Sequence, residues 1–223
     1  MANVIKVNTQ SDESIIECLP AACEVLDKGG VIAMPTDTIY GVAAKVSVTA
    51  GIQRIYNLKG RDQSKPLAIC CSDISQITRW SNCSIGEDIL KELLPGPFTL
   101  ILERSTKLNP DLNPGVQSVG IRIPDSALCI KLVAQLGEPI ALTSANISGK
   151  SSAISIEEFK ELWSEVDVIL DGGPCNQQED RRGSTIIDFT VPGKFSIVRV
   201  GSLCDETVKL LTEKYGMQNI TRQ

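Results

Sequence analysis

Short apolar runs of strand length alternate with stretches of helical periodicity along most of the chain. The apolar runs predict strands at 4–7, 31–35, 39–46, 67–71, 98–103, 118–124, 139–143 and 166–170. The stretches of helical period predict helices at 13–28, 49–57, 87–94, 127–136 and 156–163. Strands that alternate with helices commonly share one parallel or mixed sheet, so this order predicts an α/β domain.

Local signals at the C-terminal side of the chain refine this order. Ser155 and Glu158 form the pattern of a capping box at the start of the last predicted helix. Two further strands, at 185–189 and 195–200, are separated by a turn-rich connector and predict an antiparallel hairpin. The last eight residues are polar and are expected to fray. The predicted sheet is therefore twisted and contains parallel and antiparallel strands.

Chain length and apolar content fit one domain. The 223 residues are 42% hydrophobic, enough for one sizeable core, and no stretch has the composition of a long linker. The longest apolar runs stop far short of the ~20 residues that a membrane span needs. The first thirty residues are rich in Asp and Glu and contain no Arg, unlike a targeting leader. The expected compartment is the cytoplasm, with a mitochondrial fraction left open.

The complete absence of histidine changes the picture most. No Ser-His-Asp triad, Cys-His pair or His-ligated metal can form, which removes the commonest general-base chemistries. The remaining groups are those of Lys, Arg, Asp, Glu, Ser and Thr. They suit reactions that depend on placement and charge neutralisation, above all phosphoryl and nucleotidyl transfer.

Cysteine usage and net charge exclude further classes. The eight cysteines contain no C-x-x-C pair, so they are expected to be reduced, mostly buried thiols and not a zinc or redox site. The formal net charge of −5 argues against tight, charge-driven binding of nucleic acid or of an anionic membrane. A local basic pocket remains compatible with that charge.

Two polar motifs lie between the early strands. In the segment 35–41, the hydroxyls of Thr36 and Thr38 follow a buried strand, at a position where sheets commonly present groups to a ligand. Further on, Lys59 and Arg61 stand two residues apart in a predicted loop, so that both can converge on one polyanion. Each motif also fits a plainer interpretation, a polar turn for the first and a basic helix end for the second.

The strand at 118–124 has an unusual polar face. Period-two alternation puts valine and isoleucine on the core side and Ser118, Gly120 and Arg122 on the other. A guanidinium above such small residues suits a bidentate grip on a carboxylate or a phosphate. The alternative is a solvated strand face.

The segment 143–151 superficially resembles a phosphate-binding Walker A loop, but two features contradict that interpretation. Ser144 stands where the motif requires its first glycine, and the next predicted helix begins several residues too late. A strand-end loop is the better interpretation, with Ser144 and Asn146 facing a ligand and Ser152 available to phosphate oxygens. An ordinary polar turn has equal weight.

A second arginine lies in the predicted hairpin. Arg199 is surrounded by Val and Ile, where an unpaired cation would be costly. Asp188 across the hairpin and a ligand phosphate are equally weighted partners. The strand before it opens with the polar residues Gly183, Ser184 and Thr185.

Taken in series, six motifs resemble those of the YrdC-type threonylcarbamoyl-AMP synthases. They read Pro-Thr-Asp-Thr-x-Tyr-Gly, Lys-Gly-Arg followed by Lys-Pro-Leu, Leu-Pro-Gly-Pro-Phe-Thr, Gly-Ile-Arg-Ile-Pro, Thr-Ser-Ala-Asn-x-Ser-Gly and Gly-Ser-Thr-Ile. Each motif alone is a weak signal for the family, but all six in the same order are a specific one. The resemblance covers residues 14–201, approximately. The chain resembles the single-domain form of these enzymes. It differs from many relatives at Asp37, where they have Glu.

The resemblance implies an architecture and a reaction. It implies a concave ligand cleft and a division into an N-terminal strand and extension (1–13), a YrdC-like catalytic domain (14–204) and a C-terminal helix and tail (205–223). The implied reaction converts L-threonine, bicarbonate and ATP, with Mg²⁺ on the triphosphate, into L-threonylcarbamoyl-AMP and pyrophosphate. The product then passes to a tRNA threonylcarbamoyltransferase that modifies adenosine.

The resemblance also implies three overlapping sets of site residues. A polar catalytic tetrad would consist of Lys59, Arg61, Ser144 and Asn146. ATP contacts would come from Lys59, Gln63, Ser118, Ser144, Ser152 and Arg199. L-Threonine contacts would come from Thr36, Arg122, Leu142, Thr143 and Ser184. No resident metal ligand is expected.

Two other functions stay open on sequence alone. An RNA-binding module could use the same basic face for tRNA or double-stranded RNA, although the net charge and the scarcity of aromatics disfavour strong binding. A hydrolase of a carbamoyl adenylate is the third candidate, by analogy with similar domains in larger carbamoyltransferases.

Overall fold

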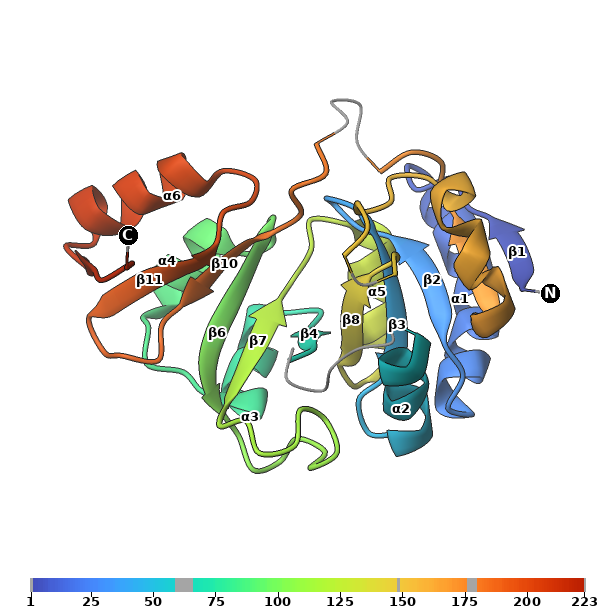
Figure 1. Cartoon of the computed structure of the whole chain (residues 1–223), viewed down its shortest axis with the longest axis horizontal. Coiled ribbons are helices and arrows are strands. Elements are labelled where there is room, and N and C mark those ends of the chain that lie inside the picture. Colours follow the sequence, from blue (N-terminus) through green and yellow to red (C-terminus); the bar gives the residue numbers. More distant parts are fainter. Residues whose placement is uncertain (1, 59–65, 148, 176–179, 223) are drawn as a thin grey trace.

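The computed structural model describes residues 2–58, 66–147, 149–175 and 180–222. Within these residues one large twisted sheet runs through the molecule in the order β1-β9-β2-β3-β8-β4-β7-β6-β10-β11-β12, and β5 pairs with β6 (Figure 1). The strands are β1 (Asn3–Lys6), β2 (Ile32–Pro35), β3 (Tyr40–Lys45), β4 (Ala68–Cys70), β5 (Ser81–Asn82), β6 (Phe98–Arg104), β7 (Ser118–Arg122), β8 (Ile140–Ser144), β9 (Val168–Asp171), β10 (Thr185–Asp188), β11 (Lys194–Arg199) and β12 (Gln218–Asn219).

The sheet is mixed, as the sequence predicts. β2 pairs antiparallel with β3, β3 with β8, and β8 with β4. β4 pairs parallel with β7, and β6 pairs parallel with β10. The predicted hairpin forms between β10 and β11, with a register shift between Ile186 and Ile187. A mixed α/β sheet with flanking helices is therefore confirmed.

Helices cover the sheet, and the sheet separates two cores. They are α1 (Asp12–Asp27), α2 (Thr49–Leu58), α3 (Ile77–Trp80), α4 (Glu87–Leu93), α5 (Ala127–Leu136) and α6 (Cys204–Lys209), with 3₁₀ turns at Ile74–Gln76 and Ile156–Glu165 and a π turn at Leu210–Lys214. α1 and α5 pack together and enclose one core, which includes Ile15, Leu128 and Met34. The larger core includes Tyr40 and Phe159. Burial on both faces explains the nearly continuous apolar character of the central strands.

Three local expectations prove wrong. Residues 156–163 form a 3₁₀ helix interrupted at Phe159, and no capping box forms there. Glu158 instead accepts the backbone N–H of Ile154 and pairs with Arg181, because this arginine lies close in space. The tail is not frayed throughout, since β12 pairs with β11. Thr221 Oγ1 also accepts the N–H of Ile197 at 2.9 Å.

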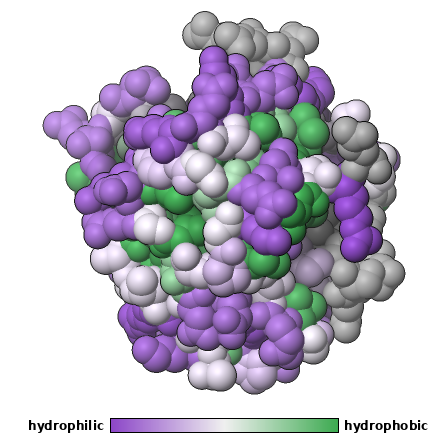
Figure 2. Space-filling model, turned by 90° about the vertical axis from the view of Figure 1, so that its left-hand side faces the viewer, coloured by the Kyte–Doolittle hydropathy of each residue, from purple (hydrophilic) through white to green (hydrophobic). Residues whose placement is uncertain are grey.

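All eight cysteines are free thiols, in agreement with the expectation. Among the described helices none combines the length and the apolar character that crossing a membrane requires. Figure 2 turns the side of α6 and β11 toward the viewer and shows apolar surface among hydrophilic residues. Val198 and Val200, in and just after β11, are exposed.

Tyr40 is buried in the larger core, where its ring lies against Phe159, and its hydroxyl gives a stability prediction. The hydroxyl donates to Gly173 O at 2.7 Å and accepts from Gly172 N at 3.1 Å, and burial raises the pKa of this phenol. Tyr40→Phe is expected to lower the free energy of unfolding by about 1–3 kcal/mol, because two backbone groups lose their partner. Urea unfolding followed by circular dichroism measures this, and an unchanged midpoint would contradict it.

Candidate active site

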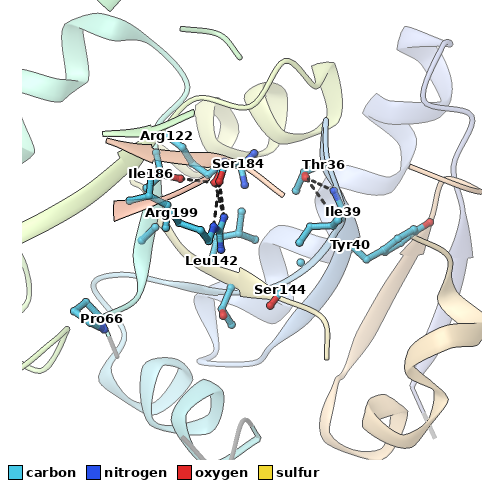
Figure 3. Close-up of a pocket in the computed structure, with 14 residues that line it drawn as sticks. Thr36, Ile39, Tyr40, Pro66, Arg122, Leu142, Ser144, Ser184, Ile186 and Arg199 are labelled. Carbon is cyan, nitrogen blue, oxygen red and sulfur yellow. Dashed lines mark hydrogen bonds between the residues drawn. The ribbon is translucent and has the colours of Figure 1, made fainter. Parts of the chain in front are cut away.

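A small cavity opens where neighbouring strands of the sheet present residues to one side (Figure 3). Its volume is about 150 Å³. Each strand from β2 to β11 along the sheet order contributes at or near one of its ends. The lining residues are Thr36, Ile39, Tyr40, Gly41, Pro66, Ala68, Thr99, Arg122, Leu142, Thr143, Ser144, Ser184, Ile186 and Arg199. Hydroxyls and two guanidinium groups supply most of its side-chain polarity.

Arg122, at the end of β7, is held by a partner that the sequence does not reveal. Its Nη2 lies 2.6 Å from Asp37 Oδ1, and both side chains are less than a tenth exposed. The other oxygen of Asp37 accepts the N–H of Asp125 at 3.1 Å, which fixes the carboxylate. Arg122 Nε is buried and has no hydrogen-bond partner among the described residues. The alternative of a solvated strand face is wrong for Arg122, because this residue is buried.

Arg199 closes the cavity from β11. Its Nη2 donates to Ser184 O at 2.7 Å and to Ser184 Oγ at 3.0 Å. Burial, and then the nearby charge of Arg122, lower the pKa of Arg199, although an arginine stays protonated in a protein. Asp188 is therefore not the partner of Arg199. Its carboxylate accepts from the N–H and hydroxyl of Thr190 at 2.8 and 2.6 Å.

Thr99 on β6 is a lining residue that the sequence analysis missed. Its Oγ1 lies 2.8 Å from Ser184 Oγ, and the side chain is 5% exposed. Thr99 is the last residue of the motif Leu-Pro-Gly-Pro-Phe-Thr. The parallel pairing of β6 with β10 brings the two hydroxyls together. Its polarity within an apolar strand, 98–102, was the available signal.

Thr36 follows β2 and lines the cavity, but its hydroxyl is already used within the β2–β3 turn. Thr36 Oγ1 donates to Ile39 O at 2.8 Å and accepts the N–H groups of Thr38 and Ile39 at 3.2 and 3.3 Å. The turn is therefore organised by this hydroxyl. Any contact of Thr36 with a ligand would add to these bonds or replace one of them.

The end of β8 forms the opposite wall. Leu142, Thr143 and Ser144 all line the cavity, and Ser144 pairs in register with Gly41 of β3. A Cβ on Gly41 would lie 2.6 Å from Leu142 Cδ1, so glycine permits this close approach. The structure thus brings together the threonine-site residues predicted from the sequence, together with Ser144 and Arg199.

Three predicted residues within the described part of the chain, Ser118, Asn146 and Ser152, do not line this cavity. Ser118 lies at the opposite end of β7, where it pairs with Glu103, four residues along the strand from Arg122. Asn146 Nδ2 donates to Lys150 O at 2.6 Å and thereby organises its own loop. The carbonyl of Ser152 accepts from Arg181 at 2.8 Å. Lys59, Arg61 and Gln63 lie outside the described residues.

Fold and site together define a mixed α/β ligand-binding domain whose cavity combines two arginines with hydroxyl donors, a set of groups suited to an anionic ligand. The Sua5/YciO/YrdC family, described under the heading of telomere recombination, matches residues 24–201. The chain belongs to this family.

Relatives with known names are members of the same family. The chain is 45% identical over 204 residues to the threonylcarbamoyl-AMP synthases of Mus musculus and of Homo sapiens, covering 90% of this chain and 73% of each relative. It is 36% identical over 157 residues to the threonylcarbamoyl-AMP synthase of Bacillus subtilis, covering 69% of this chain and 45% of that protein.

Solved structures are also similar. Sua5 of Pyrococcus abyssi, complexed with L-threonine, matches with a TM-score of 0.83 at 29% identity, covering 97% of this chain and 62% of that chain. E. coli YciO matches with a TM-score of 0.78 at 26% identity, covering 92% of this chain and 98% of that one. The chain therefore spans less than two thirds of the Sua5 structure and nearly all of YciO. The YrdC-like fold expected from the motifs is confirmed.

Proposed function

We propose that this chain is an L-threonylcarbamoyladenylate synthase, a nucleotidyltransferase that makes L-threonylcarbamoyl-AMP and pyrophosphate from L-threonine, bicarbonate and ATP. The observation that carries the proposal is the pair of arginines, Arg122 and Arg199, which share one small hydroxyl-lined cavity. Relatives with 45% identity over most of the chain are threonylcarbamoyl-AMP synthases. The relative solved with L-threonine has the same fold.

The proposed reaction has two steps that balance. The amine of threonine adds to bicarbonate carbon, and loss of water gives a carbamate. A carbamate oxygen then attacks the α-phosphorus of ATP, and the bond to the β-phosphate oxygen breaks to release pyrophosphate. Neither step requires a histidine base, because positioning and neutralisation of negative charge lower both barriers.

The residues of the cavity divide between the two substrates in this proposal. Arg122 would bind the threonine carboxylate, because Asp37 orients its guanidinium at the cavity wall. Thr36 and Ser184, with Leu142 and Thr143 at the end of β8, would surround the amino acid. Arg199 and Ser144 would face the phosphates.

The remaining ATP contacts stay predictions from the sequence. We assign Lys59, Gln63, Ser118 and Ser152 to ATP, and Lys59, Arg61, Ser144 and Asn146 to the catalytic tetrad, on the resemblance of the motifs. Pro66, the first described residue after Lys59, Arg61 and Gln63, lines the cavity.

Mg²⁺ enters the proposal with ATP. Among the described residues that line the cavity there is no carboxylate, which is the ligand that Mg²⁺ prefers in proteins. This donor set does not fit a resident magnesium site but fits an ion carried by the triphosphate and water. The ion would offset negative charge on the phosphates during transfer.

The product is a mixed anhydride that hydrolyses readily, so the proposal includes a tRNA threonylcarbamoyltransferase as its acceptor. The reaction is then the first step of N6-threonylcarbamoyladenosine formation in tRNA. We place this step in the cytoplasm, with a mitochondrial fraction and weak tRNA binding left to experiment.

The decisive assay measures pyrophosphate release by purified protein with ATP, Mg²⁺ and bicarbonate. We expect release only when L-threonine is added, because the amine supplies the carbamate nucleophile. D-Threonine, at the same concentration, is the matched control for stereospecific binding. Folded protein that binds ATP but releases no pyrophosphate would contradict the synthase and favour the RNA-binding alternative. Hydrolysis of added threonylcarbamoyl-AMP without synthesis would favour the hydrolase.

A further inference from the structure

We infer that Thr99 is a positioning residue that makes the Ser184 hydroxyl a hydrogen-bond donor toward an anionic oxygen of the ligand. The inference rests on the proposed function, because it concerns how the same cavity recognises its amino acid. It begins with three side chains that line the cavity and contact one another, Thr99, Ser184 and Arg199. Figure 3 shows the bonds between Arg199 and Ser184.

The first step is the use of the lone pairs on Ser184. Arg199 has only donors, so its Nη2 must donate to Ser184 Oγ across their 3.0 Å separation. One lone pair of Ser184 Oγ is therefore occupied. The 2.8 Å contact between Ser184 Oγ and Thr99 Oγ1 can run in either direction. The hydroxyl that donates in this bond uses its proton there, so the proton of the other hydroxyl remains for a ligand.

The second step is the surroundings of Thr99. Its Cγ2 methyl occupies the space beside Gly120, since a Cβ built on that glycine would lie 3.1 Å from this carbon. Thr99 and Ser184 are 5% and 3% exposed, both line the cavity, and Ser184 Oγ is the hydrogen-bond partner that the described residues give the Thr99 hydroxyl. If Ser184 donated to Thr99, the Thr99 proton would remain for the ligand. Because Arg199 donates to Ser184 Oγ, an anionic oxygen bound by Arg199 lies beside Ser184, which favours the arrangement in which Thr99 donates and the Ser184 proton faces the ligand.

The third step is the consequence for Ser184. When Thr99 donates, Ser184 Oγ accepts two hydrogen bonds, one from Thr99 and one from Arg199. Its own proton is then directed to the cavity that it lines. Accepting two hydrogen bonds polarises a hydroxyl and strengthens it as a donor. The chemistry that such a donor recognises beside Arg122 and Arg199 is a carboxylate or carbamate oxygen of the bound amino acid.

The test compares a substitution that removes the hydroxyl but keeps the shape of the side chain with one that keeps the hydroxyl. Thr99→Val replaces the hydroxyl by a methyl of similar size. We expect it to weaken L-threonine binding, measured by calorimetry, about 3- to 10-fold, while the KM for ATP changes less than about 2-fold. Thr99→Ser keeps the hydroxyl and is expected to restore most of the affinity. Thr78→Val, at an exposed helical threonine, is the matched control.

A double-mutant cycle separates positioning from a general packing effect. Thr99→Val should add no loss in a Ser184→Ala background, because Thr99 acts through Ser184. Equal losses in both backgrounds, or unchanged threonine affinity in Thr99→Val, would overturn the inference alone. Absence of threonine binding by the unaltered protein would count against both the inference and the proposed function.

Discussion

Arg122→Lys is expected to lower kcat/KM for L-threonine on the order of 100-fold, about 2.7 kcal/mol of transition-state stabilisation. The lysine keeps a positive charge for Asp37, so the buried carboxylate is not left without a counter-ion. It cannot reproduce the fork of donors with which a guanidinium holds a carboxylate while it pairs with Asp37. The loss should fall mainly on threonine and much less on the KM for ATP. Steady-state pyrophosphate release measures both constants.

The control for this prediction is a charge-preserving change away from the cavity. Arg79 lies on the short helix α3 and its guanidinium stacks over the Trp80 ring at 4.5 Å. Arg79→Lys is expected to leave kcat/KM within about 2-fold, because a weak exposed cation–π contact is retained. An Arg122→Lys enzyme with an unchanged KM for threonine would show that Arg122 does not contact this substrate.

Gly201→Ala is expected to destabilise the fold by about 3 kcal/mol and to reduce activity at least about 100-fold. A Cβ at residue 201 would lie 2.5 Å from both Ser184 O and Thr185 N, a separation that forces the backbone apart. The same region is held by Ser202 N donating to Gly183 O at 3.0 Å and by Gly201 N donating to Thr185 Oγ1 at 3.1 Å. Moving Ser184 would also break its bonds with Arg199. Thermal unfolding and pyrophosphate release measure the two effects.

Gly86→Ala provides the comparison for Gly201→Ala. A Cβ on Gly86 meets nothing within 4 Å, and its backbone is extended at the start of α4. The change is expected to alter the unfolding free energy by less than about 0.5 kcal/mol. Gly201→Ala protein with unaltered melting temperature and activity would contradict the packing argument at Ser184.

Much of the site could be expected from the sequence because polar residues stand at the ends of apolar strands. Thr36 after β2, Arg122 in β7 and Ser144 at the end of β8 all follow this pattern, and all line the cavity. One of the two partners considered for Arg199, Asp188, was wrong. The β10–β11 register pairs Asp188 with Ser196 and Arg199 with Ile186, and the Arg199 guanidinium bonds to Ser184, because the backbone at Gly201 lies against Ser184.

The sequence by itself determined the class of the fold and the range of chemistry. Alternating apolar strands and amphipathic helices are local patterns, and each can be recognised within a window of a few turns or residues. The absence of histidine and the spacing of Arg, Ser and Thr are likewise properties of the chain alone. They were sufficient to predict a mixed α/β domain that binds anionic groups and acts by positioning them and neutralising their charge.

Only the tertiary structure decided which side chains meet. Asp37 and Arg122 stand 85 positions apart, as do Thr99 and Ser184, and neither pair has a local signal. Their contact depends on the order and register of strands across the sheet, which many distant interactions select together. Thr99 therefore gained a role only when β6 was placed beside β10 and Arg199 closed over Ser184.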